Sequence, residues 1–181
     1  MQVSRRIEEE ILLFKIRHGD EEAFARLYEN YVDALFRFVS FRVKTEEQAQ
    51  DIVAELFLKL WQHLRATENQ VDNLRAFLYR MARNLVVDYY RERQETLPLD
   101  EAIEVSDEAG GSRYLSPQQQ VSLGEVEQAI KKLKPDWQEV VLLAYVEGFK
   151  PKEISKIIGK SPAATRVIIH RALQELKKII N

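Results

Sequence analysis

Apolar residues recur every three or four positions along most of the chain, which is the period of α-helices with one buried face. The clearest case is the stripe Phe24, Leu27, Tyr28, Tyr31, Leu35 and Phe38. Gly and Pro together number only 11 of the 181 residues, which argues against loop-rich sandwiches and barrels built from strands. The pattern therefore predicts an all-α fold.

Four helices are predicted in the first half of the chain, over 3–17, 20–43, 45–64 and 74–93. Asp20 follows Gly19 and can accept a hydrogen bond from a free amide of the helix that it starts. Thr45, with Gln48 three residues later, fits a capping box at the start of the next helix. Two of the four helix starts therefore have a specific signal.

Four shorter helices are predicted in the second half, near 123–133, 136–146, 151–158 and 162–179. Gly159 stands at the end of the third, where a left-handed backbone conformation is needed. Ser161 can cap the fourth helix, and Pro162 fits its first position. Two helices joined by such a turn predict a helix-turn-helix, whose second helix enters the major groove of DNA.

The stretch 95–120 separates the two sets of helices. It contains two Pro residues and a Gly-Gly pair, and it has no sustained apolar period. Six acidic residues against one Arg give it a net charge of −5. We therefore expect two small helical domains, 1–94 and 121–181, joined by an acidic flexible linker.

Composition argues against several kinds of chemistry. Cys is absent, so disulfides, thiol nucleophiles and cysteine–zinc sites are excluded. The three His residues are far apart in the sequence, which argues against a metal cluster, and His63 is expected to be a packed core residue. No nucleophile–base pair or phosphate-binding glycine loop is recognisable. We expect a protein that is not an enzyme and that needs neither a cofactor nor a metal.

No apolar segment is long enough to span a membrane, and the first residues form no apolar signal core. The sequence therefore predicts a cytoplasmic protein. Its net charge of −2 hides a strong asymmetry. Residues 75–93 hold five Arg against two acids, and residues 150–181 hold eight Lys or Arg against two acids. Two basic blocks suggest two nucleic-acid contacts, although solvated helices with scattered Lys and Arg would explain the charge alone.

The helix over 45–64 has one apolar arc, formed by Ala49, Ile52, Val53, Leu56, Leu60 and Leu64. Asp51 and Glu55 fall on the opposite arc, with Leu58 beside them. An exposed apolar residue next to two acids favours a docking face for a basic partner. An ordinary solvated helix face fits the same spacing.

The helix over 74–93 presents Arg80, Arg83 and Asn84 away from its apolar side. Arg and Asn reach phosphates and base edges, so this face is predicted to bind nucleic acid. Four aromatic residues add rings on which an unstacked base can lie: Phe77, Tyr79, Tyr89 and Tyr90. Of these, Tyr89 falls on the apolar side of the helix and is expected to be core. The polar loop 66–73 precedes them and can cup a flipped base. Together these features favour a single strand.

The outer face of the last helix and the turn before it is basic. It is predicted to present Lys160, Ala163, Arg166, Val167, His170 and Arg171. The N-terminal part of such a face meets base edges when the helix lies in the major groove. We therefore expect duplex DNA binding here, with His170 as a DNA contact.

Four segments in this order resemble a bacterial RNA polymerase sigma factor of the extracytoplasmic-function (ECF) type. They are GDEEAFARLYENYVDALFRF, AQDIVAELFLKLW, NLRAFLYRMARNLVVDYYRER and the helix-turn-helix. The resemblance implies a region-two domain that docks on RNA polymerase core and melts the minus-ten element. It also implies a region-four domain that reads the minus-thirty-five element as duplex. An anti-sigma factor is a further partner that the family suggests.

The resemblance also implies roles for single residues. Asp51 and Glu55 match acidic positions that dock on the clamp helices of the largest core subunit. The positions that contact the minus-ten strand match Arg80, Arg83, Asn84 and Asp88. In the family the connector lies in the RNA exit path, so the acidic segment 95–120 is expected to occupy that path as a nucleic-acid mimic.

Two other readings remain open at this point. The first is a stand-alone helix-turn-helix regulator that binds only duplex DNA and uses its first domain for dimerisation or sensing. The second is an all-helical adaptor that binds no DNA. A stand-alone regulator needs neither the Asp51 and Glu55 face nor the Arg-rich fourth helix, and an adaptor needs no basic C-terminal face.

Overall fold

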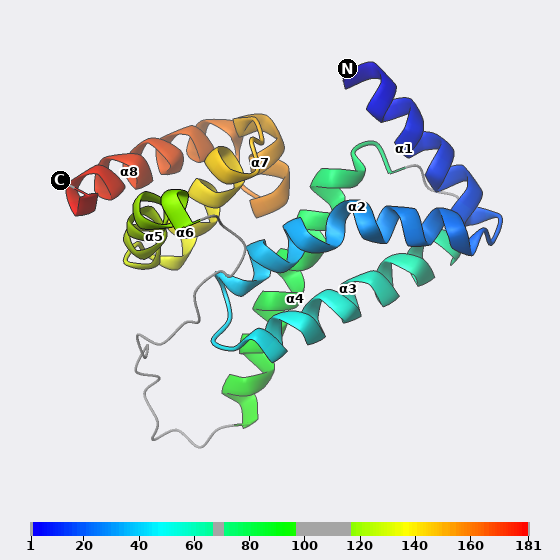
Figure 1. The fold of residues 1–181 in the computed structure, drawn as a ribbon, viewed down its shortest axis with the longest axis horizontal. Helices are drawn as coiled ribbons and strands as arrows, with labels where there is room; N and C mark the ends of the chain where they lie inside the picture. The colour runs from blue at the N-terminus through cyan, green and yellow to red at the C-terminus, as the bar shows by residue number, and fades with distance from the viewer. Residues whose placement is uncertain (1, 67–70, 97–116, 181) are drawn as a thin grey trace. The chain divides into compact units, whose positions relative to one another are not determined.

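The structure, a computed structural model, describes residues 2–66, 71–96 and 117–180. All regular elements in these ranges are helical, which confirms the predicted all-α fold. Contacts between helices divide the chain into two compact units, the first with α1–α4 and the second with α5–α8 (Figure 1).

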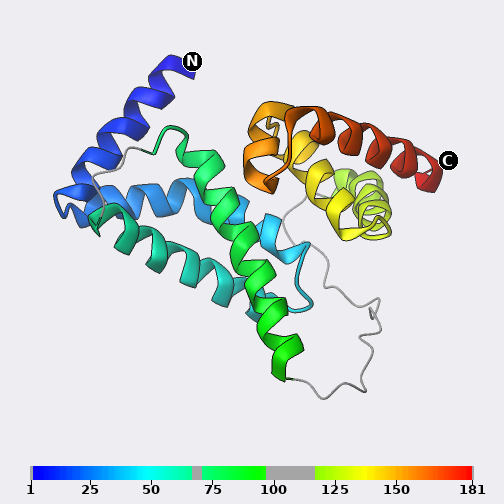
Figure 2. The same ribbon diagram turned by 180° about the vertical axis from the view of Figure 1, so that it is seen from behind.

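The first unit consists of α1 (Gln2–Arg17), α2 (Glu21–Ser40), α3 (Glu46–Ala66) and α4 (Leu74–Thr96). α2 packs against the other three helices, and α3 also packs against α1 and α4. α4 crosses α2 and α3, behind them in Figure 1 and in front of them in Figure 2. The side chains that are almost completely buried between them include Ile16, Leu27, Leu35, Phe38, Leu56, Leu60, Leu64, Leu78 and Tyr79. Burial of each large apolar side chain contributes about 1.5–3 kcal/mol, so the four helices stabilise one another.

Polar side chains start three of these helices. The carboxylate of Asp20 accepts a hydrogen bond from the Ala23 amide at 3.0 Å, as predicted. Thr45 Oγ1 accepts from the Gln48 amide at 3.3 Å, while Gln48 Oε1 accepts from the amide of Lys44 at 3.0 Å. The bond to Thr45 confirms half of the predicted capping box. The other half differs, because the Gln48 side chain accepts from the amide of Lys44 and not from the amide of Thr45. In α4 the side chain of Asn73 accepts from the amide of Ala76 at 2.9 Å.

The second unit consists of α5 (Pro117–Lys131), α6 (Pro135–Val141), η1 (Leu142–Val146), α7 (Pro151–Ile158) and α8 (Pro162–Ile180). α8 packs against α5, α6 and α7. Ile154, Ile157 and Ile158 of α7 are buried, as are Thr165, Ile169, Ala172 and Leu176 of α8. The side chain of Ser161 accepts a hydrogen bond from the Ala164 amide at 3.1 Å, which confirms the predicted cap.

Several helix bounds differ from the predicted ones, most clearly around the linker and at the end of α6. The stretch 95–120 was expected to be linker throughout, but α4 continues to Thr96 and α5 begins at Pro117. Proline breaks a helix interior but fits a first turn, where the missing amide has no partner to lose. The α-helix predicted over 136–146 ends at Val141. The residues that follow form one turn of π-helix, η1, in which the amide of Glu147 donates to the Leu142 carbonyl at 2.9 Å.

Gly159 has φ +68°, the left-handed conformation predicted for the end of α7. Nothing lies within 4 Å of a Cβ built there, so a side chain would meet backbone strain alone. Gly159→Ala should therefore lower the free energy of unfolding of the second unit by about 1–2 kcal/mol. Gly124→Ala in α5, where nothing crowds a Cβ either, is the control and should raise stability by about 0.5–1 kcal/mol. Thermal unfolding followed by circular dichroism measures the stability of both variants. An equal change in stability in the two variants would contradict the proposed backbone strain at position 159.

Candidate nucleic-acid interface

The outer face of α3 carries the acidic residues that the sequence placed there. Asp51 and Glu55 are exposed, and Leu58 on the same face is 57% exposed. The predicted apolar arc on the opposite face is buried throughout: Ala49, Ile52, Val53, Leu56, Leu60 and Leu64. An exposed Leu flanked by carboxylates can bury apolar surface against a partner with a basic rim. We refer to Asp51, Glu55 and Leu58 as the α3 docking face.

Lys59 partly balances this face. Its Nζ lies 2.7 Å from Oε1 of Glu55, and both side chains are about half exposed. The pKa of Lys59 is raised by its hydrogen bond to Glu55, with smaller contributions from the charges of Asp88 and Glu92 on α4. Asp88 and Glu92 of α4 therefore lie close enough to Lys59 for their charges to act on it. An exposed pair of this kind contributes about 0–1 kcal/mol, so a binding partner can displace Lys59 at little cost.

An aromatic cluster fills the seam between α2 and α3. The ring of Phe57 lies 4.6 Å from Tyr28 and 6.3 Å from Phe24, and Trp61 lies 4.9 Å from Phe24. Tyr28 is 42% exposed, so the apolar stripe of α2 is not buried along its whole length. The sequence does not distinguish Tyr28 from its buried neighbours, because a period places residues on a face without showing where that face meets solvent.

Four side chains were predicted to contact a single strand from α4, and the structure places them away from its buried face: Arg80, Arg83, Asn84 and Asp88. Arg83 is half-buried and the other three are exposed. The guanidinium of Arg80 lies over the ring of Phe77 at 5.4 Å, and that ring stacks on His63 of α3 at 5.1 Å. His63 is half-buried in this stack, so the prediction of a packed core residue is only partly met. The face offers donors to phosphates and one carboxylate, Asp88, that can only accept.

One of the four rings proposed for stacking on bases is misplaced. Tyr79 is completely buried and packs edge-on against Phe38 of α2 at 5.1 Å, so it cannot meet a base. Tyr90 is half-buried, and its hydroxyl donates to the backbone carbonyl of Arg42 at 2.7 Å. Burial raises the pKa of this hydroxyl. Tyr89 and Phe77 are half-buried as well. Three partly exposed rings therefore remain on α4.

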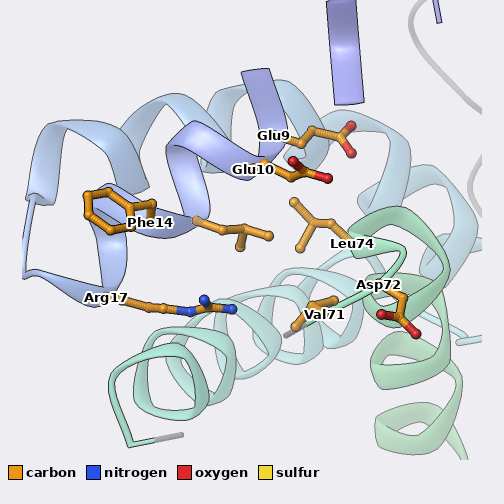
Figure 3. Close-up of a pocket in the computed structure, with 8 residues that line it drawn as sticks. Glu9, Glu10, Phe14, Arg17, Val71, Asp72 and Leu74 are labelled. Carbon is orange, nitrogen blue, oxygen red and sulfur yellow. The ribbon is translucent and has the colours of Figure 1, made fainter. Parts of the chain in front are cut away.

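A cavity of about 370 Å³ opens between α1 and the start of α4 (Figure 3). It is lined by Glu9, Glu10, Leu13, Phe14, Arg17, Val71, Asp72 and Leu74. Three carboxylates against one guanidinium make it unfavourable for a phosphate group, but carboxylates accept hydrogen bonds from the amino group of a base. The cavity borders the end of the loop 66–73, which was predicted to cup a flipped base. Residues 67–70 of that loop lie outside the described part of the chain.

The outer face of α8 and the turn before it is exposed as predicted. It presents Lys160, Ala163, Arg166, Val167, His170 and Arg171. His170 Nε2 lies 3.0 Å from the amide nitrogen of Gln174, one turn further along. The Ser161 cap and the left-handed Gly159 fix the start of this helix relative to α7. The arrangement can present Arg and His side chains to base edges in a major groove, with Lys160 near phosphates.

The family model "Sigma-70 region 2" matches residues 27–96, and "Sigma-70, region 4" matches residues 123–176. The two matches occur in the family's order and together cover more than half of the chain. The chain belongs to the sigma-70 family.

Curated relatives identify it further as an ECF-type sigma factor. The chain is 28% identical over 171 residues to the ECF RNA polymerase sigma factor BldN of Streptomyces coelicolor, and this match covers 93% of the chain and 64% of BldN. It is 28% identical over 160 residues to the ECF RNA polymerase sigma factor SigM of Bacillus subtilis, covering 86% of the chain and 93% of SigM. The chain thus spans less than two thirds of BldN but nearly all of SigM.

Two solved structures share the fold of this sigma factor. CnrH, in complex with the cytosolic domain of CnrY, has a TM-score of 0.70 and 22% identity over 96% of this chain and 97% of that chain. RpoE of Bartonella quintana, in complex with the anti-sigma factor NepR, has a TM-score of 0.72 and 23% identity over 87% of this chain and 96% of that chain. Both confirm the arrangement of helices that the resemblance implied.

The described residues of this sigma factor include no group of three or more acidic or His residues that could hold a metal ion. Within the same residues, no helix is both long enough and apolar enough to cross a membrane. DNA-binding initiation factors of this family are not classical enzymes, and the exposed faces of α3, α4 and α8 are suited to binding.

Proposed function

We propose that this chain directs RNA polymerase core to specific promoters through three separate faces, one for polymerase and two for DNA. The observation that supports this most strongly is that the family's two regions coincide with the two helical units. Region 2 matches 27–96 within the first unit, and region 4 matches 123–176 within the second. On this proposal the chain catalyses no bond change and works in the cytoplasm.

The α3 docking face is proposed to bind polymerase core. Its centre is Leu58, and Asp51 and Glu55 would pair with basic side chains at the rim of the contact. When the partner binds, the ion pair between Lys59 and Glu55 would break and the Lys59 ammonium would turn to solvent.

The α4 face is proposed to capture the non-template strand of the minus-ten element. Arg80 and Arg83 would hold phosphates, while Asn84 and Asp88 would contact base edges. Unstacking costs a few kcal/mol per base step, and stacking on a ring returns about 1–3 kcal/mol per base. Capture therefore roughly balances melting and can bias an opening that polymerase drives. The cavity beside α1 is proposed to receive one unstacked base through its amino group.

The α8 face is proposed to read the minus-thirty-five element as duplex. On this proposal residues 1–94 form a region-two domain and residues 121–181 a region-four domain. The acidic segment 95–120 would lie in the basic channel through which RNA leaves, where the growing transcript displaces it. That segment lies mostly outside the described residues.

Arg166→Ala and Arg171→Ala should weaken binding to the upstream promoter element. If Arg166 makes a bidentate contact with a guanine, its loss should cost about 1–3 kcal/mol and relax the sequence preference at one position. A contact to phosphate alone would lower the affinity evenly across sequences. Binding of polymerase holoenzyme to promoter duplexes with single base changes separates the two outcomes. Lys132→Ala, an exposed site just after α5 and outside the basic block 150–181, is the control. Unchanged binding by both Arg variants would show that DNA does not use this face.

The proposed function is tested by adding the purified chain to core polymerase on sheared genomic DNA of its source organism and mapping the 5′ ends of the RNA. Discrete start sites that core alone does not produce are the expected result. Binding to duplex DNA with no association with core would instead favour the stand-alone regulator, which no comparison supports. An anti-sigma factor is proposed as a further partner, because solved proteins of the same fold include one bound to such a factor.

A further inference from the structure

α1 has apolar side chains on both of its long faces. Leu13 and Ile16 are buried against the other helices of the first unit. Ile7 and Ile11 are each 52% exposed and Phe14 is 61% exposed, and their spacing of four and three residues puts them on one stripe on the opposite side. A helix that only covers a bundle is polar on its outer side, so a second apolar stripe indicates a second contact. We call Ile7, Ile11 and Phe14 the α1 stripe.

The α1 stripe is exposed to solvent, and at Phe14 it borders the cavity between α1 and the start of α4. In Figures 1 and 2, which view the molecule from opposite sides, the first turns of α1 extend away from the other three helices, and at Glu9 the helix meets α2, where the Tyr31 hydroxyl donates to Oε1 at 2.6 Å. At its other end the ring of Phe14 lies 4.3 Å from the ring of His18, which is itself exposed. The stripe therefore ends at the turn between α1 and α2.

That turn connects the stripe to α3. A Cβ built on Gly19 would lie 4.0 Å from the guanidinium of Arg65, and this guanidinium covers the ring of Trp61 at 5.3 Å. Arg65 stands seven residues after Leu58, two helical turns along the same exposed side of α3. Arg65 therefore lies between the turn at which the α1 stripe ends and the exposed side of α3 that carries Leu58.

The charges beside the stripe indicate the kind of partner. Glu8 and Glu10 flank its N-terminal half, and Lys15 lies beside its C-terminal end; all three are exposed. Around Ile7 and Ile11 the carboxylates do not attract a phosphate backbone, so nucleic acid is a poor occupant there. Aliphatic side chains with carboxylates beside them match an apolar protein surface with basic side chains at its rim, the same chemistry that suits the α3 docking face. One partner can therefore cover both.

We propose that the α1 stripe is the second half of the surface that binds RNA polymerase core, continuous with the α3 docking face through Arg65. The proposal rests on the proposed function. Ile11 and Phe14 are its anchors because truncation of a buried apolar anchor at a protein interface weakens binding more than loss of a rim charge.

The test measures the affinity of the full chain for core polymerase without DNA. Ile11→Ser and Phe14→Ser should each weaken binding at least about fivefold. Asn30→Ser introduces the same residue at an exposed site of α2, away from the stripe and from the α3 docking face, and should bind as the unchanged chain does. If the unchanged chain fails to bind core, the proposed function falls. If it binds and both stripe variants match it, this inference is overturned while the proposed function stands.

A second measurement does not depend on the stability of the variants. The chain has no Cys, so Ile11→Cys provides a single site for an environment-sensitive fluorophore. Addition of core should shift its emission to the blue, and a fluorophore at Asn30→Cys on α2 should shift much less. An unchanged emission at Ile11→Cys on saturation with core would overturn the proposal. A concentration-dependent shift without core would also overturn it and identify a second copy of the chain as the occupant.

Discussion

Replacing Asp51 and Glu55 together by Arg is expected to abolish association with core polymerase and to leave the first unit folded. Both side chains are exposed, and their helix is held by an opposite face that is buried throughout. Exposed substitutions of this kind usually change stability by less than about 0.5 kcal/mol. Like charges brought together at an interface cost several kcal/mol, which lowers the affinity by at least about a hundredfold. The variant should therefore keep nearly all of its stability while it loses its affinity for core.

The matched control is the pair Glu29→Arg and Asp33→Arg on α2. These two carboxylates are exposed and also four residues apart, so the change in net charge and the spacing are the same. Sedimentation with core polymerase measures association, and circular dichroism shows whether the helices remain. Transcription at the level of the unchanged chain by the Asp51 and Glu55 variant would remove the docking assignment. An equal loss of core binding in the two double variants would show that the change in net charge, and not a specific contact, weakens binding.

Helix positions and faces could be predicted from the sequence where one side of a helix is packed and the other is solvated. The inner and outer arcs of α3 agree with the 100° rotation per residue, because their apolar positions keep a strict period. The turn around Gly159 was predicted for a local reason, since only a left-handed residue closes it. Both features depend on interactions within a few residues.

The misplaced residues depend on packing between helices. Tyr79 was counted among accessible rings because aromatic composition alone does not show on which side α2 crosses α4. The cavity joins Glu10 and Arg17 to Asp72, more than fifty positions later in the chain, and no local pattern relates them. Likewise, the second apolar face of α1 becomes evident only when Leu13 and Ile16 are seen to be covered and Ile11 is not.

Strand capture by α4 should respond in two different ways to two neighbouring substitutions. Asn84→Ala should remove discrimination between sequences, because a bidentate amide contact to a base is worth about 1–3 kcal/mol against the wrong base. Arg80→Ala should lower the affinity for all sequences and reduce the slope of log K against log salt by about 0.7, the value for one phosphate contact on a single strand. Residues 1–94 carry 15 basic against 16 acidic residues, so bulk attraction to DNA is weak and these local contacts should dominate.

The measurement is a fluorescence-anisotropy titration of single-stranded non-template oligonucleotides, matched and scrambled, with the full chain bound to core polymerase. Arg26→Ala, an exposed charge on α2, is the control for Arg80 and should change neither quantity. Because Arg80 lies over Phe77, its loss also uncovers a ring, so stacking of a base there should partly offset the lost phosphate contact. The salt slope distinguishes the two contributions, since stacking does not release counterions. Equal affinity of the unchanged holoenzyme for matched and scrambled strands would refute base capture by α4.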